Sequence, residues 1–291
     1  GEKKSIRQQM EVRNPKLWSP DAPYLYRVQS RIKKGNRSID GGTTRIGIRL
    51  AEFRGKEGFW LNGKPFGQLV GANRHQDFAY VGNALPNSQQ WRDAKRLRDA
   101  GCTIIRVAHY PQDPSFMDAC DELGLFVIVA TPGWQYWNKD PKFGELVHQN
   151  TREMIRRDRN HPSIFCWSIG NEVIERKKLE VVTTARKLAD YVHKFDPSRP
   201  VTSALAAWDN DWEIYDPLAA VHEIVGYNYL LHRAPVDHQR VPSRVIMQTE
   251  SYPRDAFANW SLVNGHDYII GDFVWTAIDY LGESGIGRFY Y

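Results

Sequence analysis

The sequence predicts a (β/α)₈ barrel that is preceded by a short β segment. Eight short apolar runs of buried-strand type occur between residues 66 and 275, and helical stretches separate most of them. Polar or aromatic side chains follow almost every run at the end where the strand should finish. Alternation of strand and helix on this scale indicates a parallel sheet covered by helices. A doubly wound open sheet is the alternative.

The first 50 residues have β character. Residues 24–32 and 45–49 are strand-like, and Gly35-Asn36 and Asp40-Gly41-Gly42 mark turns between them. So few strands make a poor independent core. This segment is therefore either a fragment of a sandwich or a structure that packs on the later part of the chain.

The barrel elements then come in order. The predicted strands are residues 66–73, 103–107, 125–129, 164–169, 200–203, 221–227, 245–249 and 268–275. Ser88 should cap the first helix, which Gly101 closes, and Asp113-Pro114 should open the second, which Gly124 ends. Later helices are predicted at 144–160, 178–195 and 254–265. No eighth helix is visible after the last strand.

Composition excludes several classes of protein. The 291 residues are 42% hydrophobic and 25% charged, and the net charge of +5 is dispersed, so no nucleic-acid-binding track is expected. No apolar run approaches the ~20 residues of a membrane helix, and the first residues show no signal-peptide core. Cys102, Cys120 and Cys166 lack metal-ligand spacing and are expected to be buried thiols.

The ends of the predicted strands carry a coherent set of side chains. In a barrel of this type, chemistry gathers at the C-terminal strand ends. Two carboxylates stand there, Glu172 after the fourth strand and Glu250 after the seventh. The remaining candidates at these ends are His75, Arg106, His109, Trp134, Asn171, Tyr229 and Trp275. Paired carboxylates in a pocket of His, Asn, Tyr and Trp suit glycoside hydrolysis. Asp77, Asp113, Glu223, Asp272 and Asp279 are rival acids.

Several ordered motifs resemble the catalytic barrel of glycoside hydrolase family 2, which holds β-galactosidases, β-glucuronidases and β-mannosidases. The motifs are WSIGNE (167–172), RVAHYP (106–111), NRH (73–75), RRDRNHPSI (156–164) and DPSRP (196–200). LWSPDAPYLY (17–26) resembles the end of the immunoglobulin-like sandwich that precedes that barrel. The resemblance implies two domains, residues 1–50 from the sandwich with its linker and residues 51–291 from the barrel.

The resemblance also implies roles for individual residues. Glu172 matches the general acid/base and Glu250 the nucleophile of a retaining mechanism, with carboxyl groups about 5 Å apart. Asn171 matches the residue that binds the sugar 2-hydroxyl. Arg106, His109 and His75 match residues of the sugar pocket or their supports, Tyr229 the tyrosine near the nucleophile, and Trp275 an aromatic platform. Trp134 would belong to a sugar-binding wall, or equally to the core.

Some family features are absent. The stretch after the third strand, ATPGWQYW (130–137), lacks the acidic and histidine residues that bind magnesium in the best-known β-galactosidases. We therefore predict no metal and no cofactor. The Asn-x-Lys signature of β-glucuronidases is not visible either. We expect an exo-acting retaining β-glycosidase, most simply a β-galactosidase.

Three alternatives remain open at this stage: β-glucuronidase, β-mannosidase, or a carbohydrate-binding fragment without turnover. The expected partner is a carbohydrate, with neither nucleic acid nor membrane insertion, and the chain could form a homo-oligomer. Resemblance to a β-galactosidase-like branch common in Bacteroidetes suggests a periplasmic or secreted protein.

Overall fold

The computed structural model describes residues 4–132, 138–173, 178–206 and 212–278. Within these residues, eight parallel strands close into a barrel in the order β10-β11-β12-β13-β6-β7-β8-β9. The strands are β6 (Leu69–Arg74), β7 (Ile104–Val107), β8 (Phe126–Ala130), β9 (Ile164–Asn171), β10 (Val201–Ala206), β11 (Ile224–Asn228), β12 (Val245–Ser251) and β13 (Ile269–Ile278). The predicted barrel is confirmed, and the open sheet is excluded.

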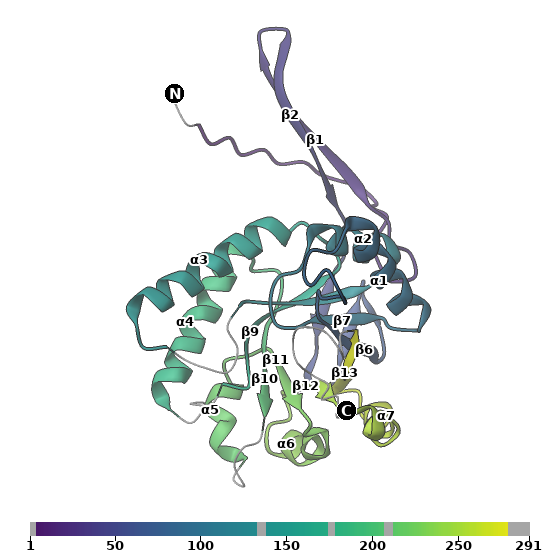
Figure 1. Cartoon of the computed structure of the whole chain (residues 1–291), viewed down its shortest axis with the longest axis vertical. Coiled ribbons are helices and arrows are strands. Elements are labelled where there is room, and N and C mark those ends of the chain that lie inside the picture. The colour runs from purple at the N-terminus through teal and green to yellow at the C-terminus, as the bar shows by residue number, and fades with distance from the viewer. Residues whose placement is uncertain (1–3, 133–137, 174–177, 207–211, 279–291) are drawn as a thin grey trace.

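A helix lies between each strand and the next, outside the barrel (Figure 1). These helices are α1 (Asn87–Asp99), α2 (Pro114–Leu123), α3 (Pro141–Asp158), α4 (Leu179–Phe195), α5 (Asp216–Ala219), α6 (Ala234–Arg240) and α7 (Ala256–Gly265). The sequence shows no eighth helix after the last strand. The residues that follow this strand, 279–291, lie outside the described part of the chain.

The cap of the first helix and the start of the third differ from the sequence prediction. The first helix is preceded by Pro86, not Ser88, and the carbonyl of Pro86 accepts hydrogen bonds from the first-turn amides of Gln89 and Gln90. The third begins at Pro141 rather than Gly144, because the Asp140 side chain accepts from the backbone of Lys142 and proline suits the first helical position. The caps at Asp113 and Gly124 are confirmed.

The segment before the barrel consists of small antiparallel sheets. Strands β1 (Tyr26–Lys34) and β2 (Arg37–Ile46) form a largely exposed hairpin that projects away from the barrel (Figure 1). Strands β3 (Ala51–Phe53), β4 (Phe59–Leu61) and β5 (Lys64–Pro65) form a second sheet. That residues 1–50 belong to an immunoglobulin-like sandwich stays a prediction.

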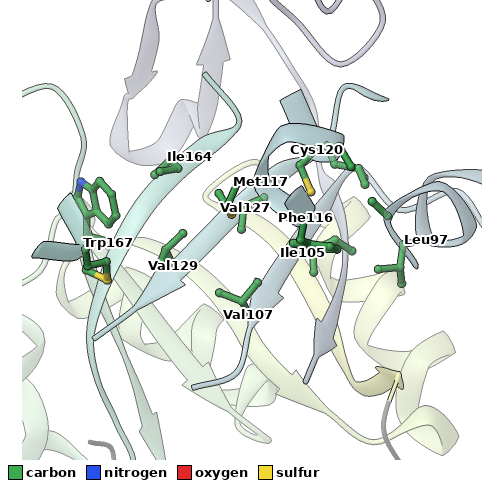
Figure 2. Packing of buried hydrophobic residues seen from close by; sticks show 14 of the residues in the cluster. Leu97, Ile105, Val107, Phe116, Met117, Cys120, Val127, Val129, Ile164 and Trp167 are labelled. Carbon is green, nitrogen blue, oxygen red and sulfur yellow. The ribbon is translucent and has the colours of Figure 1, made fainter. Parts of the chain in front are cut away.

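Successive side chains along each strand point alternately into the barrel and toward the helices outside it. Ile104 of β7 and Phe126 of β8 point inward and pack with Phe59 and Phe165 near the N-terminal strand ends. Their neighbours along the strands face outward against α1 and α2; Ile105, Val107, Val127 and Val129 belong to this outer cluster (Figure 2). Because the side-chain period of a strand is two residues, Arg106 points inward, one layer above Ile104.

Candidate active site

Arg106 lies at the centre of the C-terminal end of the barrel. It is almost completely buried, and its guanidinium donates from Nη1 to Asn73 Oδ1 (2.9 Å) and Glu250 Oε1 (2.8 Å). Its Nη2 donates to Asn171 Oδ1 (2.6 Å) and lies 3.3 Å from His109 Nδ1. The arginine side chain thereby joins residues from strands β6, β9 and β12. The planar guanidinium can hold several acceptors at once because its N–H donors have a rigid, fixed geometry.

Glu250 lies near the end of β12 and is only 5% exposed. Its Oε1 accepts from Arg106, and its Oε2 accepts from the phenol of Tyr229 at 3.0 Å. Burial raises the pKa of the Glu250 carboxyl above its ordinary value of 4.5; the charge of Arg106 opposes this rise, and the charge of Glu172 adds to it. The charge of Glu172 therefore acts on the Glu250 carboxyl.

Local backbone irregularity aims the side chains at this end. The ladder between β11 and β12 shifts register after Tyr227, so that Asn228 pairs with Glu250. Such irregularities re-aim side chains near active sites. Glu172 and Tyr229 both adopt left-handed backbone conformations, with φ of 50° and 59°. Non-glycine residues adopt this region rarely, and often at functional sites.

A hydrogen bond to a neighbouring strand holds each of these left-handed residues. The amide of Glu172 donates to the carbonyl of Ala204 (2.9 Å), and the amide of Tyr229 donates to the carbonyl of Glu250 (2.8 Å). Glu172 also accepts at Oε1 from Asn228 Nδ2, at 2.9 Å. The side chain of Glu172 is therefore positioned from both its backbone and its carboxylate.

The phenol of Tyr229 is a hydrogen-bond donor to Glu250. Burial, followed by the charge of Glu250, raises the pKa of the Tyr229 phenol far above its ordinary value of 10.0. Its ring stacks on that of Tyr252, with centroids 4.4 Å apart. The stack and the hydrogen bond together fix the phenol against the Glu250 carboxylate.

Three aromatic rings form one side of the site. The imidazole of His109 stacks on Trp275, with centroids 5.3 Å apart and planes 11° apart, and His75 meets Trp275 edge-on at 5.2 Å. Burial, with the charges of Arg106 and His75, holds the pKa of His109 well below its ordinary 6.5. A neutral His109 can accept from Arg106 at Nδ1, which places its proton on Nε2.

Among the predicted side chains, Glu172, Glu250, Asn171, Arg106, His109, His75, Tyr229 and Trp275 belong to this cluster at the C-terminal strand ends. Trp134 and the rival acid Asp279 lie outside the described residues. Asp113 caps α2, and Glu223 pairs with His193 and accepts from the amide of Val201. Asp272 is buried and accepts from Gln248 and Ser251, and Asp77 is buried as well.

Three contributors were not singled out as site residues from the sequence. Asn73 accepts from Arg106 and donates to the carbonyl of Thr249 (2.9 Å), and Thr249 donates to Asn228 Oδ1 at 2.6 Å. Asn73 and Asn228 both lie at the ends of predicted strands, and this position was the sequence feature that could have indicated a role in the site. Thr249 carried none, because a threonine inside an apolar run is ordinary strand composition.

Comparison with models of protein families identifies the family to which this barrel belongs. The family model described as "Glycosyl hydrolases family 2, TIM barrel domain" matches residues 52–280, and a second, "Glycosyl hydrolases family 2", matches residues 1–49. The chain belongs to glycoside hydrolase family 2. The resemblance inferred from the motifs is confirmed.

Individual relatives in the family carry two different activity names. A β-galactosidase of Thermoanaerobacter pseudethanolicus is 34% identical over 98% of this chain and 39% of its own length. A family 2 structure from Bacteroides cellulosilyticus DSM 14838 is 37% identical with a TM-score of 0.86, covering 94% of this chain and 37% of that one. The structure of Bacteroides uniformis β-glucuronidase 2, covalently bound to cyclophellitol-6-carboxylate aziridine, is 27% identical with a TM-score of 0.81, covering 90% and 37%.

The chain spans about two fifths of the length of the curated relatives it matches first, 39% and 42%. Within the part of this family 2 chain that the structure describes, no helix has the length and apolar character needed to cross a membrane.

One group of potential metal ligands occurs among the described residues, and it lies away from the carboxylates. Asp118, Asp121 and His161 bring ligand atoms within 4.8 Å of one another. Asp121 contacts the backbone of Ser163, just before β9 begins, so the group lies at the opposite end of the barrel. His161 contacts Asp121, and Arg45 forms an ion pair with Asp118.

Proposed function

We propose that this chain is the catalytic part of a retaining exo-β-glycosidase, in which Glu250 is the nucleophile and Glu172 the general acid/base. The observation that carries the proposal is the setting of Glu250. A buried carboxylate with one oxygen bound by Arg106 and the other by Tyr229 is held rigidly, and both donors stabilise its ionised form. Such a group is suited to attack an anomeric carbon.

The reaction would proceed in two steps. Glu250 attacks the anomeric carbon, and the bond to the leaving oxygen breaks as Glu172 delivers a proton to that oxygen. Glu172 then removes a proton from water, which attacks the anomeric carbon and releases Glu250. The covalent adduct in the B. uniformis β-glucuronidase supports such a covalent route. Asn171, whose oxygen accepts from Arg106, would turn its amide hydrogens toward the sugar.

We further propose that the sugar is β-galactose. A glucuronide would bring a carboxylate that needs a cation or several donors in the pocket. The guanidinium of Arg106, which contacts the proposed nucleophile, already serves Glu250, Asn73 and Asn171. The first matched relative, a β-galactosidase, favours the same sugar. β-Glucuronidase is the second candidate because relatives of that name also match.

The test begins with the two carboxylates in the full-length protein. Glu172→Gln and Glu250→Gln should each lower turnover of phenyl β-galactoside, whose basic leaving group needs a proton, by about 10³-fold, because each removes an essential group. Glu180→Gln, an exposed glutamate in the first turn of α4, is the control and should keep full activity. Full activity in both active-site variants would contradict the assignment.

Intact-mass detection of a trapped glycosyl-enzyme identifies nucleophile and sugar together. Wild-type protein incubated with 2-fluoro sugars of the galacto, glucurono and manno series should gain the mass of the galacto sugar, and Glu250→Gln should gain none. Labelling by the glucurono probe alone would establish the second candidate. Binding of galactosides without turnover or labelling would indicate a non-catalytic carbohydrate-binding protein.

A further inference from the structure

Asn228 is the last residue of β11 and contacts the carboxylate of Glu172 directly. Its Nδ2 donates to Glu172 Oε1 at 2.9 Å and also lies 3.2 Å from Asn171 Oδ1. Asn228 is 1% exposed, so its amide must satisfy its hydrogen bonds within the protein. Within the described ranges, the acceptors for its Nδ2 group are Asn171 Oδ1 and Glu172 Oε1.

A hydrogen bond from Thr249 fixes the orientation of the Asn228 side-chain amide. The hydroxyl of Thr249 donates to Asn228 Oδ1 at 2.6 Å, and Thr249 is itself buried. A flipped amide would point its oxygen at the oxygens of Glu172 and Asn171, so the donor group must face them. The three residues form a short chain of hydrogen bonds from Thr249 through Asn228 to Glu172.

This chain bears on which oxygen of Glu172 carries the transferable proton. Oε1 accepts a hydrogen bond from an amide donor, and a carboxyl oxygen that carries a proton is a poor acceptor in that position. We propose that Asn228, oriented by Thr249, is a positioning residue that keeps Oε1 as an acceptor and assigns the transferable proton to Oε2 of Glu172. The inference rests on the proposed function, since it requires Glu172 to be the general acid/base.

The proton balance follows from this assignment. In the first step, the C–O bond breaks, its electron pair stays on the leaving oxygen, and the proton on Oε2 moves to that oxygen. In the second step, Oε2 takes a proton from the attacking water. Asn228 gains and loses no proton in either step; its effect on proton transfer passes through Glu172, which it contacts.

A leaving-group series in the full-length protein tests the role of Asn228. The value of kcat/KM reports the first step, whose need for a proton grows as the leaving group becomes more basic. Asn228→Ala should lower kcat/KM by about 10- to 100-fold for a phenyl glycoside, and by only about two- to threefold for a dinitrophenyl glycoside. The dependence of log kcat/KM on leaving-group pKa should therefore become steeper than in wild type.

Variants at position 249 separate positioning from folding. Thr249→Val keeps the shape but removes the hydroxyl, so it should steepen the same dependence in a protein that still contains Asn228. Thr249→Ser restores the hydroxyl and should restore the wild-type dependence. Thr151→Val removes another buried threonine hydroxyl, which donates within α3 to the carbonyl of Val147, and should leave the dependence unchanged.

Two results would overturn the proposal, and they are distinguishable. An equal loss for all leaving groups, or no loss, in Asn228→Ala and Thr249→Val would show that Asn228 does not act through the proton. Absence of turnover by wild-type protein with every aryl β-glycoside would remove the proposed function and this inference with it.

Discussion

At the level of single residues, the phenol of Tyr229 and the guanidinium of Arg106 hold the same carboxylate from two sides. Burial raises the pKa of Glu250, and both donors stabilise its ionised form. In the proposed mechanism Glu250 must be ionised to attack, so activity should be present above its pKa and should fall as the pH drops through it. The acid limb of kcat/KM is therefore expected above pH 4.5, the ordinary value for a glutamate.

Removal of the Tyr229 hydroxyl should shift the acid limb of the kcat/KM profile to higher pH. Tyr229→Phe takes a hydrogen bond from the ionised form of Glu250, so the pKa rises further and the acid limb shifts to higher pH. Tyr227→Phe, two residues earlier on β11, is the control, because the Tyr227 phenol donates to Asp237 away from the site. A limb that stays in place in Tyr229→Phe, or that moves equally in both variants, would contradict this role of the phenol.

At the level of elements, a buried ion pair joins the end of β6 to α1. Arg74 donates to Asp93 at 2.7 Å, with both side chains almost fully buried, and Gln89 donates to the other oxygen of Asp93. Arg74 also donates to Gln90 and Gln112. Since Arg74 directly follows Asn73, this network supports the strand end from which Asn73 contacts Arg106.

Breaking this pair should be costly. Asp93→Asn leaves a buried guanidinium without its countercharge and should lower the free energy of unfolding by about 3–5 kcal/mol. Asp99→Asn on the same helix is the control, because Asp99 and Lys95 form an exposed pair with side chains 58% and 46% accessible. It should change stability by less than about 1 kcal/mol. Urea denaturation measures both, and equal effects would refute the special role of Asp93.

At the level of the whole molecule, the segment before β1 is joined to the N-terminal end of the barrel. Trp18 is fully buried, its ring meets Phe126 edge-on at 5.3 Å, and its Nε1 donates to the carbonyl of Asp121. Arg49, beyond β2, donates to the carbonyls of Pro162 and Ile164. Both ends of the projecting hairpin are thus anchored on the barrel.

The anchor can be tested by truncating its side chains. Trp18→Ala should lower the free energy of unfolding by about 3–5 kcal/mol through lost burial and an unfilled cavity. Tyr24→Ala removes a 41% exposed ring from the same segment and should cost about 1 kcal/mol or less. If thermal and urea denaturation find the two variants alike, then the segment before the hairpin does not contribute to the stability of the barrel.

The eight strands, the main helices and the positions of Glu172 and Glu250 at strand ends could be read from the order of residues. These features are local: an apolar run marks a buried strand, Asp113 and Gly124 mark helix ends, and parallel strands place their C-terminal residues at one rim. The family could be recognised for a related reason, since its motifs are short and contiguous.

The contacts among those residues depend on the closed barrel. Arg106 reaches Glu250, 144 positions away, and Asn228 reaches Glu172, 56 positions away. Closure and the register shift at the end of β12 decide which of several polar groups meet, and no local pattern encodes that choice. Thr249 illustrates the limit: its composition indicates only a strand, and its role as the donor behind Asn228 exists because β11 and β12 lie side by side.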